Sequence, residues 1–554
     1  MKDGDKMKLK KNSFMQGAFI AALGIVLTKI MGILYVIPFY AMIGEQGGAL
    51  YGYAYNIYSV FLGIATAGIP LAVSKLTSEY NTLGYYEAKE RAFKLSKLFL
   101  TTVGIICFII LFIFSKDIAY LILGDITGGN TIEDVTFVIR TISTAILIIP
   151  TVSVYRGYFQ GHKYITPTSI SQVLEQIVRV TIIIGGGYLL KSFGFSTKEI
   201  VACALIAATI GGVTSYLYLL IKRRSNNDKF PTAKSKKTKD AEVTNKEIFK
   251  KIFMYALPFI MIDLFKSLYN SVDIAMLVKA LVNRFNYSID DAESIMSVIS
   301  VWGNKLNMIV SAAFTGVTTS LIPSLTVDFV KQNKKGVSEK INKAYKLVTF
   351  VALPMVVGLS FLVEPVWNVF YGTSTYGPIV YRYFVFVALL SGLFSTTVII
   401  VQVLKEYKVV FLSLISGILI KIILNIPLLY VFDYFGLPAF YGSTTASLFG
   451  FGVGILISTI SISKKHEISY KSFFKQFVNI LFGVVVMVIV LCILKFFLTI
   501  TNLSRIKAIF VILTYAIVGM ITYFTVMFKT KTIHNIFGCE KVNKLTDRIL
   551  NRKK

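Results

Sequence analysis

Seven basic residues interrupt segments that are otherwise apolar enough to lie in lipid: Lys29, Arg140, Arg179, Lys266, Lys305, Arg382 and Lys421. A cation in hydrocarbon costs at least ~2.5–3.5 kcal/mol on insertion scales, so it is retained where it faces a cavity, a partner or a ligand. Few acids lie at similar depth, chiefly Glu175, Asp263 and Asp273. The pattern indicates a cavity that binds an anion. For the cations near segment ends, Arg140 and Arg382, an interfacial position is the alternative.

The composition requires a membrane. The 554 residues are 55% hydrophobic and 16% charged, with a mean hydropathy of +0.68, and a soluble protein of this size cannot bury so much apolar surface. Runs of about 20 apolar residues, each long enough to cross a bilayer, recur along the chain. We therefore predict an all-α, polytopic membrane protein with about 14 transmembrane helices. The expected spans are 14–43, 50–79, 98–123, 134–160, 164–190, 199–221, 249–278, 294–327, 344–363, 378–403, 407–432, 438–462, 474–498 and 506–528.

The charge distribution predicts the orientation. The net charge is +29, and the basic residues concentrate in alternate loops. Lys222–Lys251 and Lys331–Lys346 are basic, whereas Gly44–Ala49 carries no Lys or Arg. By the positive-inside rule both termini are cytoplasmic. The charge thus indicates topology and contact with anionic membrane lipids, and it argues against nucleic acid.

The chain contains an internal repeat. The interval from Gln160 to Arg179 equals that from Gln402 to Lys421, and both end on a cation in mid-span. A proline-containing span followed by an amphipathic segment also occurs twice, after Pro70 and after Pro323. Spans one to six and seven to twelve therefore form two parallel copies, an arrangement that holds substrate between two lobes near the midplane.

This repeat predicts the domain organisation and the site. We expect an N-terminal lobe, a basic linker, a C-terminal lobe, two extra spans and a basic amphipathic tail, at residues 1–222, 223–248, 249–463, 464–529 and 530–554. Lys29, Arg179, Lys266 and Lys421 would line the cleft. Asp263 and Asp273, with Asn425 as a neutral ligand, are the candidates for sodium or proton coupling. The alternative is that Asp263 simply pairs with Lys266, three residues later on the same helix face.

Other classes of protein lack support in the sequence. No GxxxxGK[ST] loop is present, so ATP hydrolysis by the P-loop route is excluded. The three histidines, His162, His466 and His534, lack the spacing of metal ligands. We expect no enzyme activity and no cofactor. Two classes stay open: a flippase for a lipid-linked oligosaccharide, and a cation-coupled exporter of small compounds.

Several motifs carry a family resemblance. The runs 27–39 (LTKIMGILYVIPF), 65–75 (ATAGIPLAVSK) and 155–161 (YRGYFQG), with Pro167 and the EQIVR of 175–179, resemble the MurJ-type lipid II flippases of Gram-positive bacteria. That group belongs to the polysaccharide-transporter branch of the multidrug/oligosaccharidyl-lipid/polysaccharide exporter superfamily. The resemblance extends over essentially the whole chain.

The resemblance implies two six-helix lobes around a cationic cavity, with the last two spans forming a groove for a prenyl tail. It implies movement of lipid II, an undecaprenyl-pyrophosphate-linked precursor, to the outer leaflet of the bacterial cell membrane by alternating access. Lys29, Lys305 and Arg140 match basic positions of the family, whereas the Arg that many relatives carry near Tyr35 is absent. A monomer is implied. Another lipid-linked glycan is the alternative substrate, and the energy source stays open.

Overall fold

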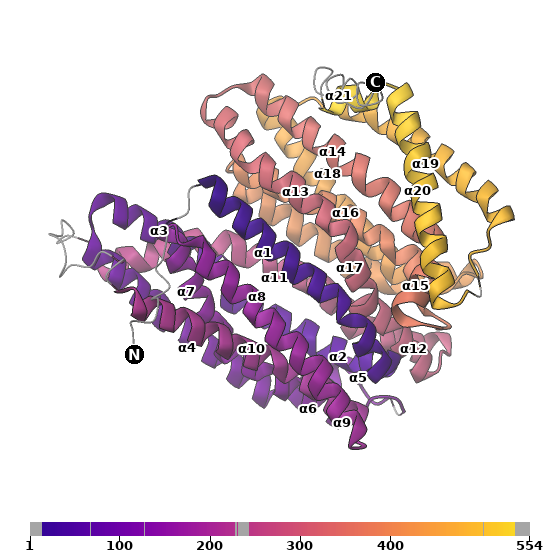
Figure 1. The fold of residues 1–554 in the computed structure, drawn as a ribbon, viewed down its shortest axis with the longest axis horizontal. Coiled ribbons are helices and arrows are strands. Elements are labelled where there is room, and N and C mark those ends of the chain that lie inside the picture. The colour runs from indigo at the N-terminus through magenta and orange to yellow at the C-terminus, as the bar shows by residue number, and fades with distance from the viewer. Residues whose placement is uncertain are drawn as a thin grey trace, which may run out of the picture. The chain divides into compact units, whose positions relative to one another are not determined.

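The computed structural model describes residues 11, 14–66, 68–126, 128–227, 230, 243–501 and 503–537, which form helices and connecting turns without strands (Figure 1). The α-helices are α1 (Phe14–Leu34), α2 (Val36–Thr66), α3 (Ile69–Leu83), α4 (Tyr86–Ile113), α5 (Ser115–Leu123), α6 (Ile132–Ser143), α7 (Ile149–Gly161), α8 (Ile165–Thr181), α9 (Gly187–Ser192), α10 (Thr197–Ser225), α11 (Asn245–Phe285), α12 (Ile289–Ser297), α13 (Gly303–Val330), α14 (Lys334–Phe361), α15 (Val363–Tyr371), α16 (Gly377–Val403), α17 (Tyr407–Tyr434), α18 (Tyr441–His466), α19 (Lys471–Phe497), α20 (Arg505–Lys529) and α21 (Thr532–Phe537). Short 3₁₀ or π turns continue three of them: η1 (Thr144–Leu147), η2 (Ile182–Gly186) and η4 (Val298–Trp302).

The predicted fold class is confirmed. Within the described residues, eleven helical segments are long and apolar enough to cross a membrane. Ten of them overlap one expected span each, and Val36–Leu83 covers the span 50–79 together with the end of the span 14–43. The other three expected spans, 14–43, 249–278 and 294–327, include side chains outside the description. The chain is therefore an all-α, polytopic membrane protein, and the total of fourteen spans stays a prediction.

The chain forms two compact units, Met1–Trp302 and Gly303–Lys554. Helix α11 follows the predicted basic linker but packs against α2, α3, α4 and α5 of the first unit. The second unit begins with α13, whose neighbours are α14 and α16. The expected domain ranges, which assign α11 to the C-terminal lobe, stay a prediction.

The first two expected spans meet at a glycine. Gly44 has φ 65° and ψ −159° within α2, a conformation that costs glycine little because it has no Cβ. The bend falls at the start of the expected loop Gly44–Ala49. The break between α1 and α2 has another cause, because Pro38 has no N–H to donate to the carbonyl four residues earlier.

Helix breaks repeat in the two units. In the first, α4 ends at Ile113, the nine-residue α5 follows after Phe114, and Gly124 ends it at φ 67°, ψ −140°. In the second, α14 ends at Phe361, the nine-residue α15 follows after Leu362, and Gly372 ends it at φ 81°, ψ −151°. The predicted repeat is thus matched in backbone geometry.

The turns that precede Arg179 and Lys421, the two cations matched by the repeat, are also alike. Lys163 and Lys405 have φ 65° and 60°, and the amide of each donates to the carbonyl of a glutamine three residues earlier, at 2.9 Å in both turns. Lys163 precedes Arg179, and Lys405 precedes Lys421, by the same sixteen residues. The matched spacing before Arg179 and Lys421 is therefore accompanied by the same turn geometry, and the repeat of whole lobes stays a prediction.

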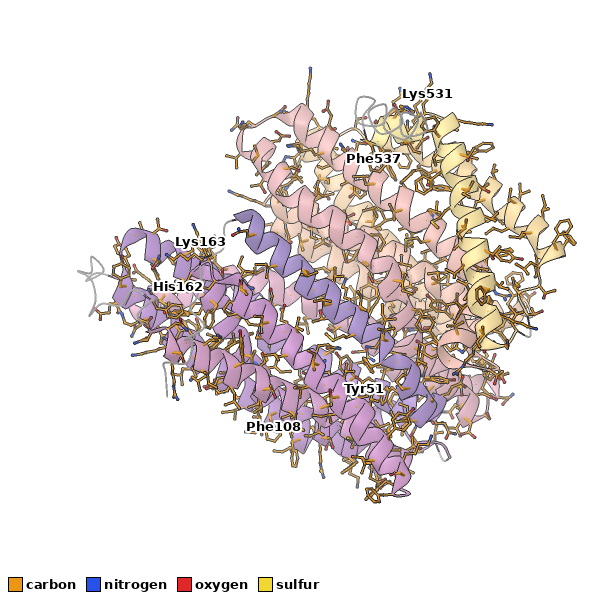
Figure 2. The ribbon with its side chains drawn as sticks, in the orientation of Figure 1. Tyr51, Phe108, His162, Lys163, Lys531 and Phe537 are labelled. Carbon is orange, nitrogen blue, oxygen red and sulfur yellow. The ribbon has the colours of Figure 1, made fainter. Side chains whose placement is uncertain are left out.

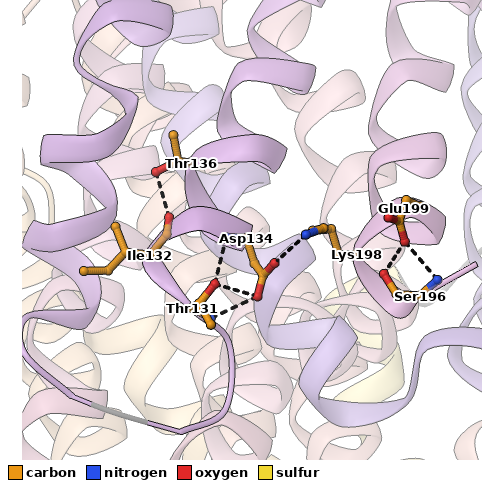
Figure 3. A network of polar contacts seen from close by, with 7 residues as sticks. All are labelled: Thr131, Ile132, Asp134, Thr136, Ser196, Lys198 and Glu199. Carbon is orange, nitrogen blue, oxygen red and sulfur yellow. Dashed lines mark hydrogen bonds and ion pairs between the residues drawn. The ribbon is translucent and has the colours of Figure 1, made fainter.

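Hydrogen bonds join the starts of α6 and α10 in the first unit (Figure 3). The Thr131 hydroxyl accepts from the Asp134 amide at 3.1 Å, and the Asp134 carboxylate accepts from the Thr131 amide at 3.1 Å, which forms a capping box. Asp134 also pairs with Lys198 of α10 at 3.2 Å. The ion pair links the start of α6 to the start of α10, the helix that packs along α8.

Candidate substrate-binding site

A partly buried ion pair joins three helices of the first unit. Arg156 on α7 pairs with Glu175 on α8, with 2.8 Å between Nη2 and Oε2. The same guanidinium donates to the hydroxyls of Ser171 at 3.0 Å and of Ser215, on α10, at 2.9 Å. The exposed fractions of the two charged side chains are only 15% and 17%. The charge of Glu175 is therefore already balanced by Arg156.

Arg179 lies one turn beyond Glu175 on the same face of α8. Its Nε is buried and has no hydrogen-bond partner, and within the described part of the chain no carboxylate forms an ion pair with it. The phenol groups of Tyr51, Tyr55 and Tyr58 lie close enough to act on its charge. A buried guanidinium with an unsatisfied donor can bind an anion such as a phosphate.

The tyrosines near Arg179 form a stripe on α2. Tyr51 and Tyr55 are stacked, with ring centroids 5.4 Å apart, and Tyr58 lies 5.8 Å from Tyr55. The three positions are four and then three residues apart, so they share one helix face. The spacing of Tyr51, Tyr55 and Tyr58 is visible in the sequence, but it did not by itself predict that these tyrosines lie near Arg179.

Lys29 lies on the helix that packs along α8. Contact between α1 and α8 is close at Gly24, where an added Cβ would lie 3.1 Å from the Ser169 Cβ. Lys29 itself is half-buried. Two of the predicted cleft cations, Lys29 and Arg179, thus lie on helices that pack side by side in the first unit.

In the second unit the matched cation is fully buried. Lys421 on α17 is 1% exposed, and Asn425, one turn later, is 0% exposed. Lys305 on α13 is half-buried. Two residues further, the side-chain oxygen of Asn307 accepts from the Tyr381 hydroxyl at 3.3 Å.

Arg140 and Arg382 are both exposed and contact the segments beside the repeated helix breaks. Arg140 Nε donates to the Ser115 hydroxyl at 2.9 Å and to the Phe112 carbonyl at 3.3 Å. Arg382 pairs with Glu364 at 2.8 Å. Both contacts suit the interfacial alternative, and the role of Arg140 in substrate binding stays a prediction.

The remaining predicted residues divide between the units. The side chains of Lys266 and Asp263 lie outside the described residues, so their predicted roles and their pairing are untested. Asp273 on α11 is 2% exposed and belongs to the first unit, whereas Asn425 belongs to the second. The coupling site stays a prediction.

An apolar groove of about 400 Å³ runs between α14, α19 and α20 of the second unit. Every lining residue is apolar or aromatic, Pro354, Gly358 and Met487 among them. The two tyrosines that line it turn their hydroxyls onto backbone carbonyls. Tyr523 donates to Phe350 at 2.9 Å and Tyr515 to Leu498 at 2.5 Å. A hydrocarbon chain is the ligand that such a wall suits.

The sequence also did not predict a role for Arg156 in the site. This residue lies only four positions before the end of the expected span 134–160, so it was not counted among the intramembrane cations. The interval of nineteen residues between Arg156 and Glu175 contains no signal that the two side chains meet, because the contact depends on how α7 and α8 pack.

Comparisons with known proteins identify the family of the chain. A family model described as polysaccharide biosynthesis protein matches residues 14–326. Lipid II flippase MurJ of Bacillus subtilis (strain 168) is 32% identical over 538 residues, which cover 95% of this chain and 97% of that protein. The chain belongs to the MurJ family. Stage V sporulation protein B of the same organism is 27% identical over 215 residues, or 38% of this chain and 39% of that protein.

Solved structures show the same fold. The inward closed conformation of lipid II flippase MurJ superposes with a TM-score of 0.66 at 17% identity, covering 93% of this chain and 99% of that one. An inward-facing multidrug resistance transporter of the MATE family gives a TM-score of 0.60 at 14% identity, covering 79% and 94%. These likenesses establish a MurJ/MATE-type transporter fold.

Proposed function

We propose that this chain moves lipid II from the cytoplasmic to the outer leaflet of the bacterial cell membrane by alternating access, without catalysing a reaction. The strongest support is its 32% identity to MurJ of Bacillus subtilis over 97% of that protein. Because the alignment with MurJ covers nearly the whole of both chains, it favours a lipid-linked substrate over a drug.

The two sites match the two halves of such a substrate. The pyrophosphate of lipid II needs cations, and Arg179 offers a guanidinium with a buried, unsatisfied Nε beside a Glu175 that pairs with Arg156. Its prenyl tail needs an apolar channel, which the groove of α14, α19 and α20 offers. Charge-assisted hydrogen bonds to phosphate are worth roughly 1.5–3 kcal/mol each, so a few of them account for specific engagement of the head group.

The energy for the cycle is proposed to come from an ion gradient or the membrane potential. A single charge that crosses the whole field gains ~2.3 kcal/mol per 100 mV. Asp273, buried on α11, is the described acid best suited to carry a proton or contact sodium. Transport by Asp273→Asn should lose its dependence on sodium concentration or on pH, and an unchanged dependence on both would remove Asp273 from the coupling step.

Two alternatives follow from the relatives. Another lipid-linked glycan would use the same cations and groove. A MATE-like exporter of cationic compounds would instead require acids facing its substrate, and in the described cluster Glu175 is already paired with Arg156. The pairing argues against a cation site at this position.

A depletion experiment tests the proposal. The flippase of a Gram-positive host is depleted while this chain is expressed, with Arg179→Gln and Arg224→Gln as a matched pair that each remove one guanidinium; Arg224 is exposed in the last turn of α10. We expect growth with the unaltered chain and with Arg224→Gln, and loss of growth with Arg179→Gln at equal protein levels. Failure of the unaltered chain to support growth, when it is present in the membrane, would count against lipid II as substrate.

A further inference from the structure

The second unit also contains a polar pocket. It lies where α14 and α19 begin, beside the short helix α21 that follows α20. It encloses about 710 Å³. Four lysines line it, together with serine and asparagine side chains and one carboxylate, Glu339. The lysines are Lys343 and Lys346 on α14 and Lys471 and Lys475 on α19. The concentration of positive charge indicates an anion site.

The pocket is held together by specific contacts. Asn342, only 4% exposed, donates from Nδ2 to the Ser469 carbonyl at 2.8 Å and accepts on Oδ1 from the Phe473 amide at 3.1 Å. Lys346 is 9% exposed and donates to the Ser472 hydroxyl at 2.7 Å. These bonds bring the starts of α14 and α19 together, so the position of the Lys346 ammonium is fixed by the fold.

Within the described residues, the four lysines of the pocket are not paired with carboxylates. Among the described residues none of them forms an ion pair, whereas other lysines at this end do, such as Lys334 with Glu467 at 3.0 Å and Lys465 with Glu406 at 2.5 Å. Helix α19 begins with no acidic residue in its first turn and no side-chain cap. Its dipole therefore adds positive potential at the pocket. A buried ammonium without a counter-charge is costly unless an anion joins it.

We propose that this pocket binds the phosphate of an anionic glycerophospholipid from the surrounding leaflet. The lysines lie at the ends of expected spans, the depth at which phospholipid head groups occur. Beside them on α19, Phe474 and Val478 are 61% and 63% exposed and offer an apolar surface for acyl chains. Phe474 also lines an apolar cavity of about 620 Å³, together with Tyr470, Phe473 and Phe477. A soluble anion would gain nothing from these surfaces.

The site differs from the substrate residues described above. It contains none of the predicted cleft cations, and it does not depend on lipid II being the transported molecule. The short helix α21 contributes Asn535 and Ile536 to its wall, and Lys531 and Phe537 lie at the same end of the second unit (Figure 2). Bound lipid would hold α21 against α14 and α19.

The test uses the full chain in nanodiscs that contain equal amounts of phosphatidylglycerol and phosphatidylcholine, with the retained lipids measured by native mass spectrometry. The pocket variant is K346Q/K471Q, in which the amide that replaces the Lys346 ammonium can still donate to Ser472. The control is K405Q/K408Q, which removes the same charge from exposed positions of the second unit. We expect the unaltered chain and the control to favour phosphatidylglycerol, and the pocket variant to lose this preference by roughly tenfold.

Three outcomes would overturn the proposal. One is an unchanged lipid preference in both K346Q/K471Q and the second variant K471Q/K475Q, whose sites are exposed and therefore tolerant of substitution. Another is displacement of phosphatidylglycerol by millimolar inorganic phosphate, which would indicate a soluble anion. The last is retention of a polyprenyl phosphate with no retention of phosphatidylglycerol, which would assign the pocket to the transported lipid.

Discussion

Arg156 and Glu175 form an ion pair with 2.8 Å between Nη2 and Oε2, one helical turn from the unsatisfied Nε of Arg179. The pair engages the carboxylate of Glu175, which lies one turn from Arg179 on α8. Within the described residues no carboxylate forms an ion pair with Arg179, as expected of a residue that binds an anionic head group.

The first prediction concerns this pair. Arg156→Gln should free Glu175 to neutralise Arg179, since the two lie four residues apart on one helix face. Transport should then fall by roughly tenfold or more, the effect of losing one charge-assisted contact. The double variant Arg156→Gln, Glu175→Gln should recover part of the rate, because the competing carboxylate is gone. Equal rates for the single and double variants would show that Glu175 does not act on Arg179. The measurement is lipid II export in the depleted host.

The second prediction concerns the groove. Gly358 lines it, and an added Cβ at this position meets no atom within 4 Å. Gly358→Phe should fill the groove and block transport without loss of folding, since replacing a helical glycine favours the helix.

Gly452 offers a matched control for Gly358. It lines the other apolar cavity of the second unit, and an added Cβ there also meets no atom within 4 Å. Transport should continue in Gly452→Phe. The opposite result, with Gly452→Phe inactive and Gly358→Phe active, would place the prenyl tail in the other cavity. Protein levels and melting temperatures of both variants are measured alongside transport.

The third prediction concerns pH and stability. Glu293 precedes the expected span 294–327, is 0% exposed, and accepts from the Asn130 side chain at 2.8 Å. Burial raises the pKa of Glu293 from 4.5 to about 7, although hydrogen bonds from Asn130 oppose the shift. Between these values the folded protein keeps a proton that the unfolded chain has lost. The contribution of Glu293 to stability therefore falls as the pH rises from about 4.5 to 7.

Thermal unfolding at pH 5 and pH 8 measures this effect. Glu293→Gln is neutral at both values, so its melting temperature should fall less than that of the unaltered chain between them. Glu133→Gln, an exposed position in the first turn of α6, should behave as the unaltered chain does. Parallel pH dependence in the unaltered chain and in Glu293→Gln would refute the assignment.

Sequence patterns predicted those features that depend on composition and spacing. Apolar runs identified the membrane spans because hydrocarbon requires about 20 apolar residues in a helix. The matched intervals before Arg179 and Lys421 predicted a repeat, and the turns at Lys163 and Lys405 share the same left-handed geometry. Glycine positions alone did not reveal that α2 continues through Gly44 with a bend.

Features that depend on packing between helices were not visible in the sequence. Neither the Arg156–Glu175 pair nor the lysine pocket has a local motif, because their members come from different helices. Arg140 and Arg382 were correctly placed near segment ends, but their contacts with Ser115 and Glu364 required the structure. Side-chain depth in a bundle follows from which helix face meets a neighbour, and hydropathy alone does not specify this.

The most direct test of the central claim is the rate at which lipid II reaches the outer leaflet. In cells whose own flippase is depleted, labelled lipid II is exposed to an impermeant enzyme that cleaves it only from outside. With this chain present, we predict that cleavage returns to the undepleted rate, and that it falls to the depleted rate with Arg179→Gln or Gly358→Phe. Cleavage that stays at the depleted rate while the unaltered chain is abundant in the membrane would contradict the assignment as a lipid II flippase.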